Sequence, residues 1–173
     1  GHAWVFLELG RRIEHSVSVL TLLNQMFQKP ASRVIMETLL TICDSLLTYR
    51  SRYLSALQAA PAVDLVLTDD SNPQSVLFQV RRLLECVRAL PREEAFPLSR
   101  AEQRLIILQA RLETADVYRA CRDQAGDLRD LAEEGINLLW QVSDDLTQTY
   151  FTHASRHHAM APAQRVDQGG ESV

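Results

Sequence analysis

The chain of 173 residues is long enough to bury one hydrophobic core, and its 46% hydrophobic and 23% charged residues are typical of a globular protein. The net charge of −4 lacks the basic surplus of a general nucleic-acid-binding protein, and no apolar run approaches the ~20 residues of a membrane-spanning helix. These values argue against nucleic acid and membrane as partners.

The cysteines and the first residues indicate the setting of the chain. Cys43, Cys86 and Cys121 are far apart and lie within helical patterns, which is typical of small core residues in a reduced, cytoplasmic protein. The sequence begins Gly-His-Ala-Trp, without a methionine or a signal peptide, and its apolar periodicity starts almost at once. We expect a fragment of a longer protein, and a replaced natural start is the alternative.

Two long helices are predicted in the first third of the chain, and their lengths suit a long helix bundle. Apolar residues spaced by three and four predict the first helix over residues 3 to about 27, where Lys29 and Pro30 end it. The second helix is predicted over about residues 32–57, and Pro61 closes this segment. Its apolar seam consists of Ile35, Leu39, Ile42, Leu46, Tyr49, Tyr53 and Leu57.

The stretch AVDLVLTDDSNPQS interrupts the helical pattern. Val63–Leu67 has no second strand to pair with, so we expect an extended, packed connector there. Asn72 and Pro73 predict the N-cap and the first position of a third helix, which reaches about Leu90. The polar residues of this stretch fit local capping or, alternatively, contact with a partner or a cation. These residues are Asp69, Asp70, Asn72 and Ser75.

The second half of the chain predicts two further helices and a tail. Ser99 and Glu102 form a capping box that opens a fourth helix, which Gly126 ends, and Asp127 caps a fifth helix that reaches Tyr150. Periodicity is lost beyond about residue 155, so we assign residues 1–154 to a helical domain and residues 155–173 to a flexible tail. The predicted class is all-α, an up-and-down bundle of about five long antiparallel helices.

The stretch FLELGRRIEH in the first helix sets a charged pair beside a glycine. On a helical wheel, Arg11 and Glu14 lie on a flank between the main apolar stripe and a second apolar side. This predicts a helix that is central or that meets a partner missing from the fragment. We expect Arg11 and Glu14 to pair, and Gly10 to permit close approach of a neighbour. Two hypotheses stay open: the pair braces helix packing, or it binds a ligand or partner.

This stretch resembles the motif of alpha-E domains, a bacterial all-helical family named for its helices and a Glu-Arg motif. Members carry an apolar-aromatic run, Leu-Gly-Arg, two further residues and then Glu-Arg. Leu9, Gly10, Arg11 and Glu14 match position by position, while His15 stands where the family usually has arginine. A role carried by that arginine therefore does not transfer to His15.

Two further stretches extend the resemblance to nearly the whole chain up to the tail. DLVLTDDSNPQSVLFQVRRLLECVRAL is similar to a second family segment, with Asp70, Pro73 and Ser75 in corresponding places, and INLLWQVSDDLTQTYF resembles the closing helix. The family's domain is about twice as long and carries the motif in each half. The chain resembles its C-terminal half.

The resemblance implies a setting for the function. Alpha-E domains resemble companions of circularly permuted ATP-grasp ligases, so the expected partners are an ATP-grasp ligase module and the missing N-terminal half of the domain. The main hypothesis is a non-catalytic accessory module for amide-bond (peptide) synthesis or modification. The alternatives are a ligand-binding or catalytic domain that uses Arg11 and Glu14 in an interhelical polar pocket, and a homo-oligomeric scaffold.

The remaining candidates favour structure over chemistry. Arg81, Arg82 and Arg88 predict a basic patch that is solvated or that docks an anion or a partner. His153 and His157 are spaced by four but lack a framework of further ligands. We therefore predict no catalytic residue, no metal and no cofactor. The candidate binding or structural residues are Gly10, Arg11, Glu14, His15, Asp70, Asn72, Ser75 and Arg81.

Overall fold

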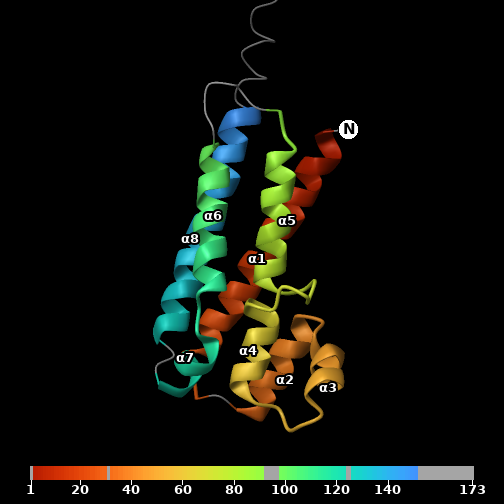
Figure 1. Cartoon of the computed structure of the whole chain (residues 1–173), viewed down its shortest axis with the longest axis vertical. Coiled ribbons are helices and arrows are strands. Elements are labelled where there is room, and N and C mark those ends of the chain that lie inside the picture. The colour runs from red at the N-terminus through yellow and green to blue at the C-terminus, as the bar shows by residue number, and fades with distance from the viewer. Residues whose placement is uncertain (1, 31, 92–97, 124–125, 152–173) are drawn as a thin grey trace, which may run out of the picture.

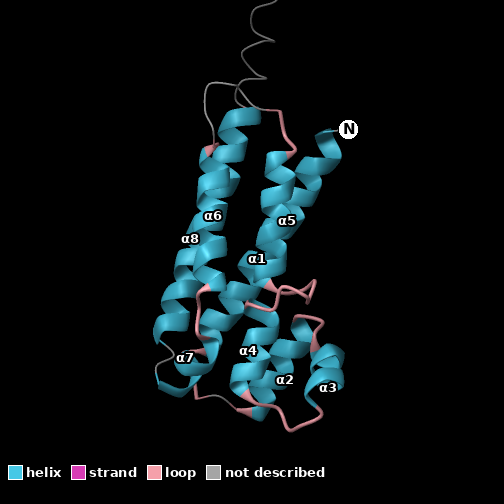
Figure 2. Ribbon diagram, in the orientation of Figure 1, coloured by secondary structure: helices cyan, strands magenta, loops and turns pink. Residues whose placement is uncertain are grey.

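The computed structural model describes residues 2–30, 32–91, 98–123 and 126–151, and all regular structure within them is α-helical (Figure 1, Figure 2). The all-α prediction is thereby confirmed, although this part of the chain forms eight helices and not about five. They are α1 (His2–Met26), α2 (Arg33–Ile42), α3 (Leu46–Tyr53), α4 (Ala59–Leu67), α5 (Val76–Arg88), α6 (Arg100–Glu113), α7 (Val117–Asp123) and α8 (Gly126–Tyr150).

Four of these helices form an up-and-down bundle. α1 packs against α5 and α8, and α6 packs against the same two helices. In Figure 1 the chain descends along α1, ascends along α5, descends along α6 and ascends along α8. Neighbouring helices are therefore antiparallel, as the short connections of the sequence predicted.

The core of the bundle is built from the periodic apolar faces of these helices. Leu20 of α1, Leu105 of α6 and Leu139 of α8 are completely buried, and each such side chain contributes about 1.5–3 kcal/mol of transfer free energy. Gly135 of α8 faces this core, and a Cβ built on it would lie 2.8 Å from Leu20 Cδ1 and 3.3 Å from Leu108 Cδ1. Gly135 thus lets α8 approach α1 and α6 closely.

The helices α2, α3, α4 and α7 cover one end of the bundle (Figure 1). α4 is their centre, since it contacts α7, α2, α1 and α5. The extended connector predicted at Val63–Leu67 is wrong, because these residues belong to α4. Every residue of this run except Asp64 is apolar and buried, because α4 is surrounded by its neighbours along most of its surface. Pro61 lies in its first turn, where a missing N–H removes no helical hydrogen bond.

The single helix predicted over about residues 32–57 is also wrong, because it breaks into α2 and α3. Asp44 adopts a left-handed conformation with φ 48°. Its N–H donates to Thr41 O (3.1 Å), and the Ser45 N–H donates to Leu40 O (2.7 Å). This is the Schellman pattern of a helix end, with Asp44 in the place that glycine usually takes. Ile42 of the predicted seam is 65% exposed, since the buried side of α2 carries Leu39 and Leu40 instead.

The fourth and fifth predicted helices are revised in the same way. Ser99 caps α6 as predicted and accepts a hydrogen bond from the Glu102 N–H (3.2 Å), but α6 ends well before Gly126. Asp116 then starts α7 by accepting a hydrogen bond from the Arg119 N–H (2.9 Å). Gly126 is the first residue of α8 and ends no helix. The predicted tail and its boundary at residue 154 lie outside the described residues.

Candidate functional site

The family-like motif of the sequence lies on α1, with its first members on one exposed side. We call this side the outer face of α1; it consists of Trp4, Leu7, Gly10, Arg11 and Glu14. All five residues are exposed, and the exposed fractions of Trp4 and Leu7 are 64% and 69%. Gly10, Arg11 and Glu14 of the motif therefore face away from the hydrophobic core, whereas Leu9 of the same motif is buried in it.

Two predictions for the outer face are wrong. Arg11 does not pair with Glu14; its Nη2 lies 3.2 Å from the Oε2 of Glu8, one turn earlier. The same Glu8 oxygen also forms an ion pair with Arg12, whose Nη2 lies 3.0 Å away. Gly10 permits no close approach either, since a Cβ built there has no atom within 4 Å. The glycine that is needed for packing is Gly135, not Gly10.

The other side of the motif meets α5 around a cavity of about 340 Å³. We call it the arginine cavity. Its wall carries three guanidinium groups and, among the described residues, no carboxylate. The lining residues are Arg11, Arg12 and His15 of α1, Phe78, Gln79 and Arg82 of α5, and Pro73 and Gln74 of the turn before α5.

Hydrogen bonds from buried groups hold the two walls of the arginine cavity together. Gln79 is 9% exposed; its Oε1 accepts from Arg12 Nη1 (2.9 Å), and its Nε2 donates to Pro73 O (2.6 Å). His15 contacts the Gln74 carbonyl through Nε2 at 2.9 Å. Because a carbonyl only accepts, this bond requires the proton on Nε2. The cavity is thus organised by the chain itself.

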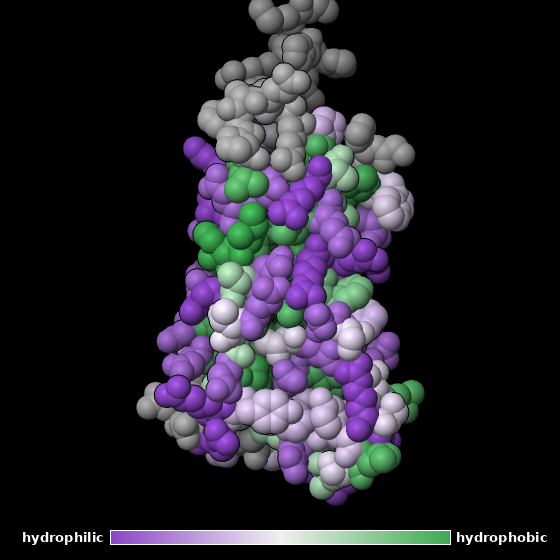
Figure 3. Space-filling view, in the orientation of Figure 1, coloured by the Kyte–Doolittle hydropathy of each residue, from purple (hydrophilic) through white to green (hydrophobic). Residues whose placement is uncertain are grey.

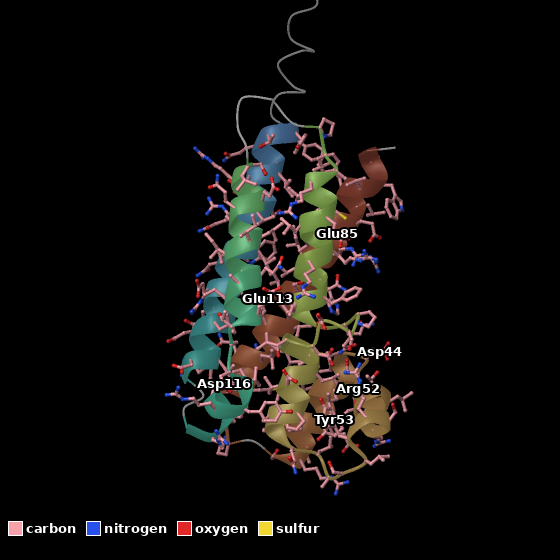
Figure 4. The ribbon with its side chains drawn as sticks, in the orientation of Figure 1. Asp44, Arg52, Tyr53, Glu85, Glu113 and Asp116 are labelled. Atoms are coloured by element: carbon pink, nitrogen blue, oxygen red, sulfur yellow. The ribbon has the colours of Figure 1, made fainter. Side chains whose placement is uncertain are left out.

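Arg82 forms the α5 side of the arginine cavity. Its guanidinium lies 5.7 Å from the centre of the Phe78 ring and 2.7 Å from Glu85, which Figure 4 labels on α5. About half of each side chain of this ion pair is exposed. Solvent screens such a pair, which contributes at most about 1 kcal/mol, so Glu85 does not fix Arg82 strongly.

The second polar group of the sequence surrounds the turn before α5. We call it the capping cluster; it consists of Asp69, Ser71, Asn72 and Ser75. Ser75, and not the predicted Asn72, is the N-cap of α5, because its Oγ accepts from the Phe78 N–H (3.1 Å). The same hydroxyl donates to Asp69 O (2.5 Å). Pro73 therefore precedes the helix instead of opening it.

Asn72 is the buried centre of the capping cluster, with 3% of its surface exposed. Its Nδ2 donates to Leu65 O (2.8 Å) and to Ser45 Oγ (3.1 Å). Its Oδ1 accepts from the Gln74 N–H (3.2 Å). These bonds tie the turn to α4 and to the start of α3, so the contacts of Asn72 are those of an architectural residue.

Asp69 is the charged member of the capping cluster. It accepts hydrogen bonds from the N–H (2.8 Å) and the Oγ (2.6 Å) of Ser71 and forms an ion pair with Arg52. Burial acts to raise the pKa of Asp69, but the bonds from Ser71 and Arg52 outweigh it and hold the pKa below its usual value. The carboxylate is thus satisfied within the chain.

Asp70 and Arg81 lie beyond the capping cluster, at the surface. Arg81 binds Asp70 (2.6 Å) and also Glu113 (2.8 Å), which lies on α6 beside α5 in Figure 4. The hydrogen bond from Arg81 lowers the pKa of Glu113. Arg88 binds the buried Glu102 at 2.9 Å. Each arginine of the predicted basic patch therefore has a carboxylate partner, and two of them bridge α5 to α6.

No metal centre or membrane span is found in the described parts of the chain. No three His, Cys, Asp or Glu side chains there are placed to hold a metal ion, and none of the helices combines the length and apolar character of a membrane span. His153 and His157 lie outside the described residues. The three cysteines are free, and burial raises the pKa of the Cys43 thiol to about 11.

The chain is similar to a known protein family and to proteins of two mycobacteria. A family model described as "Alpha-E: A predicted alpha-helical domain with a conserved ER motif" matches residues 1–151. The chain belongs to the Alpha-E family. This Alpha-E domain is also 30% identical over 154 residues to uncharacterized proteins of Mycobacterium tuberculosis (strain H37Rv) and Mycobacterium bovis. The match covers 84% of the chain but only 17% of each relative. No solved structure is significantly similar.

The two positions of the family's Glu-Arg motif lie on different surfaces of this Alpha-E domain. By the resemblance, Glu14 and His15 occupy the two places; Glu14 is exposed on the outer face, whereas His15 lines the arginine cavity. Sequence reasoning missed Glu8, Arg12 and Gln79. Glu8, Arg12 and His15 follow one another at spacings of four and three, which places them on one flank of the helix.

Proposed function

We propose that this Alpha-E domain is a non-catalytic helical module that docks onto an ATP-grasp ligase and assists amide-bond (peptide) synthesis or modification in the cytoplasm. The observation that carries the proposal is the outer face of α1, where Trp4 and Leu7 are both more than 60% exposed. A solvent-exposed tryptophan beside an exposed leucine, rimmed by charged residues, is typical of an interaction surface. The face seen in Figure 3 is mostly hydrophilic, with scattered hydrophobic groups.

The choice of partner rests on family membership and on length. The mycobacterial relatives are several times as long as this chain, which covers 17% of each. Proteins of that length have room for further modules beside an Alpha-E domain. We take the ATP-grasp ligase as the occupant of the outer face. The N-terminal half of the domain and a second copy of the chain are the competing occupants that the experiment separates.

The alternative of a catalytic pocket built by Arg11 and Glu14 has weaker support. Arg11 lines the arginine cavity, but Glu14 lies on the outer face and outside it. A general acid or base must reach the reacting group within about 2.6–3.2 Å. We therefore propose no reaction for the pair.

Co-purification with an ATP-grasp ligase from the same genome tests the docking proposal. We expect a complex in size-exclusion chromatography and a change in the ATPase activity of the ligase. The double variant Trp4→Ser/Leu7→Ser should lose both, because it removes the exposed apolar surface. Leu47→Ser is the matched control, since Leu47 is 80% exposed on α3. No complex and no change in ATPase activity would overturn the proposal, as would self-association through Trp4 in sedimentation.

A further inference from the structure

The arginine cavity shares Arg11 with the outer face but is otherwise a different surface, and the cavity carries an inference of its own. A second cavity of about 340 Å³, between α6, α7 and α8, has Arg111 and Arg119 in its wall but also Asp116, Asp127 and Asp130. The positive charges of this second cavity are therefore offset by acidic residues in the same wall. The arginine cavity has Arg11, Arg12 and Arg82 and no acidic lining residue among those described.

The carboxylates near the arginine cavity leave many of its donors open. A guanidinium offers five N–H donors. Arg11 makes one ion pair, with Glu8, and Arg82 makes one, with Glu85. Arg12 is fixed by Glu8 and Gln79, yet its Nε–H is buried and has no hydrogen-bond partner. The wall therefore combines positive charge with donors that the described residues do not satisfy.

The arrangement of these donors is preorganised. Gln79 holds the Arg12 guanidinium at 2.9 Å and is itself held by Pro73 O at 2.6 Å, so Arg12 is oriented before any ligand arrives. Preorganised groups lose little conformational entropy on binding. The fork of a guanidinium matches two oxygen atoms of a carboxylate or phosphate group. A volume of about 340 Å³ is at the lower end of small-molecule sites.

We propose that the arginine cavity between α1 and α5 binds a small oxyanion, a phosphate or carboxylate group, through Arg11, Arg12 and Arg82. The anion accepts hydrogen bonds from the free guanidinium donors, and Glu8 and Glu85 remain outside as partners of the same arginines. The site does not require the docking of a ligase, so either proposal can fail without the other.

Titration of the 173-residue chain with inorganic phosphate and, separately, with citrate tests this site through amide NMR spectra. We expect saturable shifts centred on His15, Gln79 and Arg82. Arg82→Gln should weaken binding about tenfold, as the loss of one charged hydrogen bond implies. Arg50→Gln is the charge-matched control, because Arg50 is an exposed α3 residue that pairs with Glu37. It should bind like the wild type.

Two further variants, His15→Arg and Arg12→Gln, test anion binding by the same cavity. His15→Arg places the usual family residue in the wall and adds a positive charge, so it should bind the anion more tightly. Arg12→Gln should abolish binding, and Arg82→Gln replaces it as the test if Arg12→Gln fails to fold. Stronger binding of phosphate identifies a phosphate site, and stronger binding of citrate a carboxylate site. The proposal is overturned if neither anion gives saturable shifts, or if Arg50→Gln weakens binding as much as Arg82→Gln.

Discussion

The capping cluster and the arginine cavity meet at the turn before α5, but the polar side chains of the two regions are satisfied within the chain to different extents. In the capping cluster, Asp69 and Asn72 find their partners within the chain, from α3, α4 and the turn itself. In the arginine cavity, Arg12 keeps a buried Nε–H without a partner, and Arg82 is held by an exposed ion pair and by its contact with the Phe78 ring. A satisfied polar group stabilises a fold, whereas open donors are available to a ligand.

Asn72→Ala gives the largest expected effect and tests the architectural side of this comparison. The change removes three hydrogen bonds and leaves Leu65 O and Ser45 Oγ without their donor in a buried place. We expect the free energy of unfolding to fall by about 2–3 kcal/mol. Urea denaturation measures it. Asp70→Ala, at an exposed ion pair, is the control and should lose less than about 1 kcal/mol. Equal losses in the two variants would contradict the architectural role.

Gly10→Ala and Gly135→Ala should shift stability in opposite directions. Gly10 has open space around it, so alanine should stabilise the helix by up to about 1 kcal/mol. At Gly135 the added Cβ would lie only 2.8 Å from Leu20 Cδ1, so overpacking of about 1–3 kcal/mol should outweigh the same helical gain. Thermal unfolding measures both. If Gly10→Ala lowered the thermal stability, another group would have to pack against Gly10 on the outer face.

Asp69→Asn should lower the stability of the chain by about 1 kcal/mol at neutral pH, because it weakens the bonds to Arg52 and Ser71. The pKa of Asp69 is lower in the folded state than its ordinary value of about 3.9. Its stabilisation is therefore present above that value and lost as the pH falls through the lower, folded-state pKa. Urea denaturation from pH 7 downward should show the two proteins converging at acid pH. If the difference in unfolding free energy between the two proteins stayed constant down to acid pH, the Asp69 carboxylate would not be the source of the stabilisation.

Arg82→Gln has the smallest expected effect on stability. The ion pair to Glu85 is half-exposed, and the contact with Phe78 joins an exposed guanidinium to a half-buried ring. We expect a loss of less than about 1 kcal/mol in urea denaturation. A larger loss would mean that Arg82 belongs to the architecture, as Asn72 does, and the contrast between the two regions would disappear.

The sequence predicted the class, the long first and last helices and the N-cap Ser99 because these depend on local periodicity and capping. It missed the end of α2 at Asp44, since a Schellman end without glycine leaves no local signal. It also missed the end of α6 at Thr114, where the last residue keeps a helical conformation and no glycine or proline marks the break. It also missed α4, because a short helix that is buried along most of its surface has the same apolar run as a packed connector. The arginine cavity could not be predicted, since Arg12 meets Gln79 across 67 positions of the chain.

The comparison of the two regions is tested most directly by the stabilisation that an oxyanion adds. A ligand that binds the folded chain raises its free energy of unfolding by an amount set by ligand concentration and Kd. Urea denaturation with and without phosphate or citrate should show the same increment for the wild type and Asp69→Asn, although Asp69→Asn starts lower. Arg82→Gln should start near the wild type and lose most of the increment. An increment that survives in Arg82→Gln but vanishes in Asp69→Asn would contradict the account.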